Sequence, residues 1–138
     1  MKTIFLATLL AALPAFAQDA PKNACPLDFQ RTKLRITRPD ARLTLRYKNT
    51  SAKQIVGAKF TLEFIDSTGD HSEYPEDFGD SSRTKPGETI MFDGTWTLFI
   101  GDEAAPKFRV YVKKIAFADG TTWADDGTGK CSFTGKSY

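Results

Sequence analysis

The stretch from Gln54 to Asp66 constrains the fold most strongly, because every second residue in its central part is apolar. The apolar positions are Ala58, Phe60, Leu62 and Phe64, with polar side chains between most of them. A period of two is typical of a β-strand that buries one face and exposes the other. The segment therefore predicts a strand in a half-buried sheet.

The same alternation recurs in residues 31–37, 41–49 and 107–117, and no segment has a helical period of useful length. Gly57 and the pair Lys113–Lys114 stand where the apolar phase changes, which predicts β-bulges. Asp119–Gly120 is a typical two-residue hairpin turn between strands. We expect an all-β fold, an antiparallel β-sandwich of about seven strands in the style of immunoglobulin or fibronectin III domains, with a partly open barrel as the alternative.

The chain of 138 residues divides into four parts. Residues 1–17 have the charged start, short apolar middle and Ala-Phe-Ala exit of a secretory signal peptide. Residues 18–30 are expected to form a polar leader, residues 31–124 the sandwich domain, and residues 125–138 a loose tail without pattern. No stretch approaches the roughly 20 apolar residues of a membrane-spanning helix. We expect a secreted or periplasmic protein without a membrane span.

The two cysteines stand near the ends of the expected mature chain. Paired cysteines are usual in exported proteins. We therefore predict a disulfide between Cys25 and Cys131 that ties the tail to the domain.

Charge is nearly balanced over the whole chain, at +2, but it is unevenly distributed. Residues 31–59 contain nine basic side chains against Asp40 alone, whereas residues 63–103 contain eleven acidic ones against Arg83 and Lys85. The small net charge gives no reason to expect nucleic acid as a partner. One interpretation is two strand regions that offset each other across the surface, and the other is a basic face for an anionic surface or glycan.

Three segments taken together, RYKNTSAKQIVGAKFTLEFIDSTGD, KPGETIMF and VYVKKIAFADGTTW, resemble small bacterial extracytoplasmic immunoglobulin-like domains related to the FxLYD group. The resemblance covers roughly residues 43–123 and lies in the turn chemistry and strand order, while the FxLYD tetrapeptide itself is absent. It implies a β-sandwich of the mostly uncharacterised, non-catalytic kind, and it assigns no functional residue.

Residues suited to catalysis or metal binding are few. His71 is the only histidine, and its neighbours in sequence cannot converge on it as a triad does. The acidic loop 73–80 carries Glu73, Glu76, Asp77 and Asp80, which could hold calcium or act as a hydrolase pair, and residues 125–126 offer two more carboxylates. None of these has the spacing of a known calcium loop, so we expect a solvated loop, no metal, no cofactor and no catalytic residue.

Three aromatic residues fall in irregular segments, where they can be exposed: Tyr74, Phe78 and Trp96. Sandwich modules stack such rings on sugars, so these residues are the predicted ligand site. The favoured function is an exported, non-enzymatic binding or interaction module with a protein or glycan partner. The alternatives are a structural or assembly protein of the envelope that pairs through an edge strand, and a hydrolase that uses the acidic loop.

Overall fold

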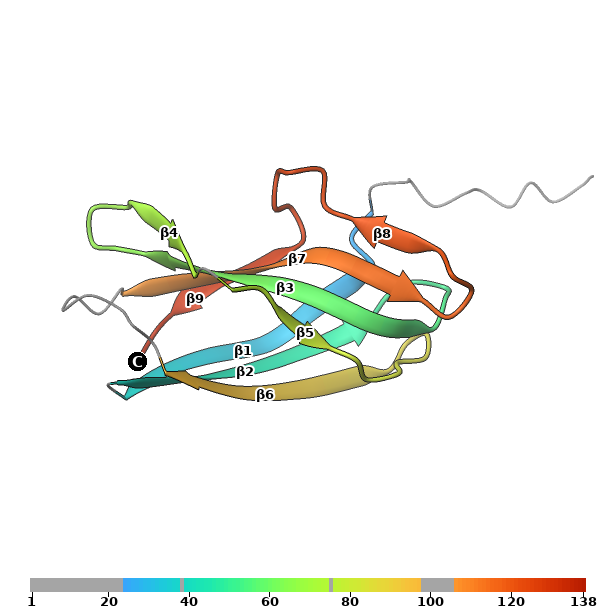
Figure 1. The fold of residues 1–138 in the computed structure, drawn as a ribbon, viewed down its shortest axis with the longest axis horizontal. Coiled ribbons are helices and arrows are strands. Elements are labelled where there is room, and N and C mark those ends of the chain that lie inside the picture. The colour runs from blue at the N-terminus through green and yellow to red at the C-terminus, as the bar shows by residue number, and fades with distance from the viewer. Residues whose placement is uncertain (1–23, 38, 75, 98–105) are drawn as a thin grey trace, which may run out of the picture.

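The computed structural model describes residues 24–37, 39–74, 76–97 and 106–138, without the side chains of residues 96 and 97 (Figure 1). Within these ranges the secondary structure is all β. The strands are β1 (Leu27–Thr37), β2 (Asp40–Asn49), β3 (Ile55–Ile65), β4 (His71–Glu73), β5 (Phe78–Asp80), β6 (Thr89–Thr97), β7 (Lys107–Phe117), β8 (Thr122–Ala124) and β9 (Ser132–Lys136). The described residues include no helix able to cross a membrane.

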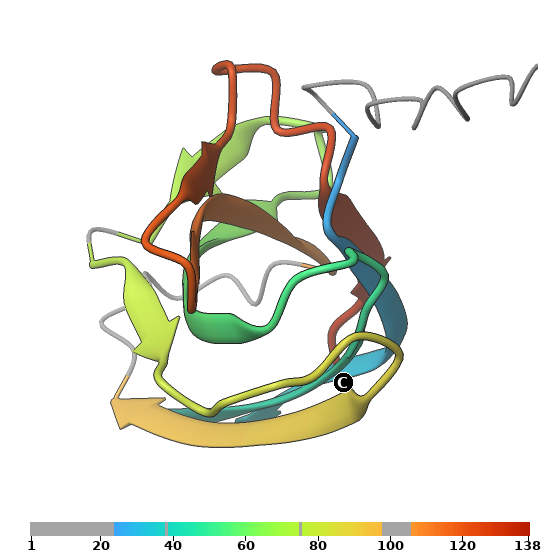
Figure 2. The same ribbon diagram turned by 90° about the vertical axis from the view of Figure 1, so that its right-hand side faces the viewer.

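The strands form two antiparallel sheets that lie as separate layers in Figures 1 and 2. One sheet has three strands in the order β1-β2-β6. The other has six, with β3 and β7 paired at its centre, β4 and β5 on the far side of β3, and β8 and β9 on the far side of β7. The chain passes from one layer to the other after β2, after β5 and after β6. The predicted antiparallel sandwich is confirmed, and the short strands β4 and β5, of three residues each, come from the segment that has no sequence pattern.

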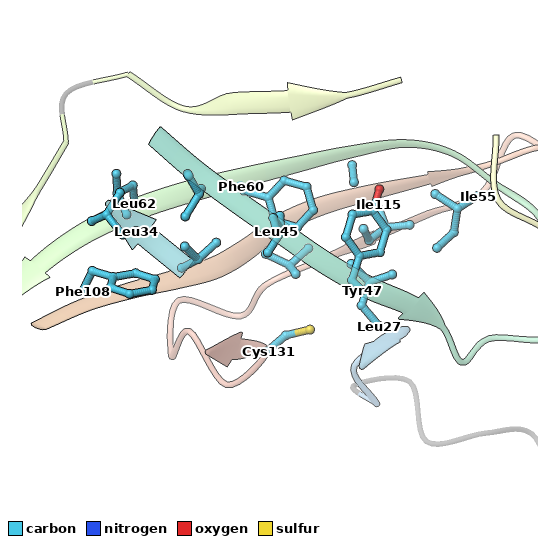
Figure 3. Packing of buried hydrophobic residues seen from close by; sticks show 14 of the residues in the cluster. Leu27, Leu34, Leu45, Tyr47, Ile55, Phe60, Leu62, Phe108, Ile115 and Cys131 are labelled. Atoms are coloured by element: carbon cyan, nitrogen blue, oxygen red, sulfur yellow. The ribbon is translucent and has the colours of Figure 1, made fainter. Parts of the chain in front are cut away.

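Apolar side chains from the inner faces fill the space between the layers (Figure 3). Leu45 and Tyr47 of β2 and Phe60 of β3 are fully buried in it. Each large apolar side chain removed from water in this way contributes about 1.5–3 kcal/mol. The alternation read from the sequence is therefore the pattern that builds the core.

Bulges adjust which face the side chains reach. The β3–β7 register shifts between Ile55 and Gly57 and again between Lys59 and Phe60, opposite Lys113. Both predicted phase changes are thus confirmed. A third shift, in β1 between Phe29 and Arg31, has no signal in the sequence.

Cys25 and Cys131 form the predicted disulfide, with their Cα atoms 5.3 Å apart. It joins the segment before β1 to the segment before β9, and so links one layer to the other. The expected boundaries need two corrections. The first strand begins at Leu27, inside the supposed leader, because Leu27 packs into the core, and the supposed loose tail contains β9, which pairs with β7 over Ser132–Lys136.

Candidate functional site

The outer face of the three-stranded sheet carries a groove of about 370 Å³. Since successive side chains on a strand point to opposite faces, the polar residues that alternate with the core residues of β1 and β2 all emerge on this side. We call this surface the basic face and define it by its lining residues: Arg31, Lys33, Arg35, Arg42, Thr44, Arg46, Met91 and Tyr138.

The bulge in β1 places Arg31 on the basic face. Leu27 and Phe29, two residues apart, turn toward the core, and the register then shifts so that Thr32 and Leu34 are the buried positions. Without the shift, the odd-numbered residues of β1 would continue to face the core, and Arg31 would point inward. Bulges commonly redirect a side chain in this way beside functional sites.

The register fixes the spacing of the charges. Arg31 lies directly opposite Arg46, and Arg35 directly opposite Arg42. Residues opposite each other in an antiparallel pair have Cβ atoms about 4.5–5.5 Å apart, and like charges in that position are destabilising. Lys33 lies between the two arginine pairs, opposite Thr44. The face is therefore a close-set array of five cationic side chains.

Only Arg42 in this array has an acidic partner among the described residues. Its Nε donates to Oδ1 of Asp93 at 2.9 Å and its Nη2 donates to Oδ2, a bidentate pair. The hydrogen bond from Arg42 holds the pKa of the Asp93 carboxyl below its usual range. The remaining cations, Arg31, Lys33, Arg35 and Arg46, form no hydrogen bond or ion pair through their side chains in the described part of the chain.

Two exposed apolar side chains flank these charges. Met91, which is 69% exposed, lies opposite Arg46 on β6, and Tyr138 is 64% exposed. They are the large hydrophobic residues most exposed in the described part of the chain. The tail brings Tyr138 here by running beside β1, where the Ile36 amide donates to the carbonyl of Tyr138 at 2.7 Å. The groove thus combines guanidinium groups with a phenol ring and a thioether.

The three aromatic residues predicted as a stacking platform lie elsewhere. The Phe78 ring stacks on Phe60 at 5.3 Å and on Phe92 at 5.5 Å between centroids, and it is half-buried. Tyr74 is also half-buried and packs against the core. Trp96 is paired with Ala41 through the β2–β6 ladder, and its side chain lies outside the described residues. Phe78 and Tyr74 therefore serve packing, and the sugar-stacking hypothesis for Trp96 stays a prediction.

The carboxylates of the acidic loop point to separate partners. Glu73 accepts from the Tyr111 hydroxyl at 2.5 Å, Asp77 from Thr61 at 2.6 Å, and Asp80 from Tyr47 at 2.7 Å. The described residues contain no group of three or more His, Cys, Asp or Glu side chains placed to hold a metal ion. Asp125 and Asp126 accept from backbone amides of their own loop.

A second hollow, of about 440 Å³, lies on the outer face of the six-stranded sheet. Oε2 of the buried Glu63 carboxylate lies 3.3 Å from Nη1 of Arg109, and its Oε1 lies 3.0 Å from Nδ1 of His71. Burial, and after it the hydrogen bond to Glu73, raises the pKa of Tyr111 to about 12. Charges of opposite sign are matched inside this hollow, whereas on the basic face they are not. The basic face is therefore the stronger candidate site.

No protein-family model and no curated protein matches the chain. Among solved structures, it is similar to an alkylpurine DNA glycosylase of Pseudomonas fluorescens bound to DNA containing an abasic site analogue, with a TM-score of 0.45 and 10% identity over 82% of this chain. This chain spans 30% of that protein's length. A structural genomics target matches with a TM-score of 0.41 and 11% identity, over 74% of this chain and 84% of the target. These similarities are too weak to carry a functional inference.

The uneven charge of residues 31–59 was the sequence signal for this site, since it already suggested a basic face. Sequence reasoning missed three components. Asp93 gave no signal for the site, because it is a single carboxylate within β6 that meets Arg42 only through the pairing of β6 with β2. Met91 and Tyr138 gave no signal, because each reaches the groove only through pairing with a distant strand.

Proposed function

We propose that this protein is an exported, non-catalytic binding module that holds an anionic polymer, such as an acidic glycan, on its basic face. The observation that carries the proposal is the set of cations without an acidic partner: Arg31, Lys33, Arg35 and Arg46. These side chains share one concave surface with exposed apolar groups. Arginine is well suited to such a role, because its planar fork of donors matches carboxylate, sulfate and phosphate groups.

The cost of the arrangement supports a ligand. Like charges directly opposite each other destabilise a sheet, and Arg31 faces Arg46 without an acidic partner in the described part of the chain, whereas Asp93 partly offsets the charge of Arg42 opposite Arg35. A polyanion would neutralise them and convert the repulsion into binding free energy. Because the groups are exposed, the attraction should weaken strongly as salt is added.

Three further elements of the proposal rest on the sequence. The signal-peptide pattern supports export, and the Cys25–Cys131 disulfide is compatible with an oxidising compartment. The resemblance to bacterial immunoglobulin-like domains supports a module without enzymatic activity. The assembly and hydrolase alternatives stay predictions, and the separation of the acidic-loop carboxylates onto different partners gives the hydrolase no added support.

The proposal is tested by the affinity of the purified protein for dextran sulfate, followed by calorimetry at two or more salt concentrations. We expect binding that weakens as salt rises, and a loss of at least about tenfold in the triple variant Arg31→Gln/Arg35→Gln/Arg46→Gln. The matched control is Arg83→Gln, which removes a charge from an exposed loop away from the groove. Equal affinity in the triple variant and the control would contradict the basic face as the site.

A further inference from the structure

The Arg42–Asp93 pair shows how this surface accommodates a carboxylate. One guanidinium fork donates through Nε and Nη2 to the two oxygens of one carboxylate. This fork uses the two lone pairs of the carboxylate that converge on one side, one from each oxygen, and the remaining lone pairs point away from each other. A second arginine directly opposite would find no equivalent pair of acceptors.

Arg31 and Arg46 are two such opposed arginines. They lie directly opposite each other, with Cβ atoms about 4.5–5.5 Å apart, and neither has a partner among the described residues. Together they offer two forks from two adjacent strands. A sulfate or phosphate ester has three terminal oxygens arranged around a tetrahedral centre, so it can accept from both forks at once.

From this geometry we propose that the basic face selects sulfate or phosphate esters over carboxylates, with Arg31 and Arg46 as the clamp for one such group. The inference rests on the proposed function, because it names the chemical class of anion that the same face binds. The bulge between Phe29 and Arg31 makes the clamp possible, since it turns Arg31 to the same side as Arg46.

The neighbouring charges indicate a ligand with repeated anionic groups. Lys33 and Arg35 follow Arg31 along the exposed side of β1, at roughly 7 Å and 13 Å from it for a strand rise of about 3.3–3.4 Å per residue. A single small anion occupying the clamp would leave these two cations unmatched. A chain that carries successive esters would engage them in turn.

Two polymers distinguish selectivity for one class of anion from attraction to negative charge in general. Dextran sulfate and carboxymethyl dextran have the same backbone, and they are compared at equal chain length and degree of substitution, with unmodified dextran as the neutral control. We expect dextran sulfate to bind at least about tenfold more tightly to the unmodified protein. Equal affinities, or tighter binding of carboxymethyl dextran, would overturn the inference while leaving the proposed function intact. Binding of neither charged polymer would instead contradict the proposed function.

The double variant Arg31→Lys/Arg46→Lys tests the clamp itself, because lysine keeps the charge but loses the planar fork. We expect this variant to bind carboxymethyl dextran as before and to lose most of its preference for dextran sulfate. An unchanged preference would place the selectivity elsewhere and overturn the assignment. The control Lys48→Arg adds a fork on the same sheet outside the groove lining, and it should keep the original preference.

Inorganic phosphate and inorganic sulfate test whether a chain is needed. Each is added as a competitor, at an equal concentration of anionic groups, to the protein bound to dextran sulfate. We expect little displacement, because a free ion reaches the clamp but not Lys33 and Arg35 together. Displacement as effective as that by unlabelled dextran sulfate would show that a single ion is sufficient and would overturn the polymer assignment.

Discussion

The hydroxyl of Tyr47, on the three-stranded sheet, donates to Oδ2 of Asp80, on the six-stranded sheet, at 2.7 Å. Tyr47 is fully buried and Asp80 is 9% exposed, so the bond crosses the core between the layers. The Tyr47 ring also packs on Phe60, at 5.5 Å between centroids. One residue thus supplies both apolar packing and a polar link between the sheets.

Removing the Tyr47 hydroxyl should destabilise the fold. In Tyr47→Phe the ring packing is kept, but Oδ2 of the buried Asp80 carboxylate loses its donor, while Oδ1 still accepts from the Ser82 amide. Leaving a buried acceptor unsatisfied costs about 1–3 kcal/mol, and more where the group is charged. We expect the free energy of unfolding, measured with urea, to fall by at least about 1 kcal/mol. Tyr138→Phe, on an exposed ring, is the control and should change it by less than about 0.5 kcal/mol.

Tyr111 should make the protein less stable in alkali. Its pKa is raised to about 12 by burial and by the hydrogen bond to Glu73, whereas an unfolded tyrosine ionises near pH 10. Between these values the unfolded state binds fewer protons than the folded state, so stability falls as pH rises from about 10 to about 12. Burial also raises the pKa of Tyr47, which acts in the same direction.

Denaturant unfolding at a series of pH values measures this effect. We expect Tyr111→Phe to show a shallower decline above pH 10 than the unmodified protein, since one tyrosine no longer contributes. Tyrosinate absorbance gives an independent check. If all four tyrosines of the chain ionised together near pH 10, this account of Tyr111 would be wrong.

The disulfide should contribute a large share of the stability. Cys25 and Cys131 are separated by 106 residues, and closing a loop of that size in the unfolded chain is worth on the order of 4–5 kcal/mol by the chain-entropy argument. The double variant Cys25→Ala/Cys131→Ala should therefore lose about 3–5 kcal/mol in the free energy of unfolding. Adding reductant to the unmodified protein should give a similar loss and should not affect the variant. Two titratable thiols in the native, unreduced protein would contradict the bond.

Much of the fold could be predicted because it follows from local periodicity. The core residues of β2 alternate throughout and those of β3 alternate from Ala58 to Phe64, and each predicted bulge coincides with a visible change of phase, at Gly57 and at Lys113. The Asp119–Gly120 turn supplies its own signal, because Gly120 has a φ of 84°. The disulfide followed from the number and position of the cysteines.

Other elements depend on distant partners and could not be predicted. The residues of β9 include Gly135 and Thr134, and they become a strand only because β7 offers an edge to pair with. The register shift before Arg31 is accompanied by no glycine or proline. Phe78 falls in an irregular segment, and its place in an aromatic stack is set by Phe60 and Phe92 from other strands.

Asp93 should limit binding on the basic face, because its carboxylate already occupies the fork of Arg42. In Asp93→Asn the negative charge is removed and the Arg42 guanidinium becomes available to an incoming anion. We expect the affinity for dextran sulfate to rise several-fold, with a steeper dependence on salt because one more cation takes part. Glu76→Gln removes a charge from an exposed residue of the acidic loop, outside the groove lining, and is the matched control. An affinity in Asp93→Asn no higher than that of the control would show that Arg42 takes no part in binding.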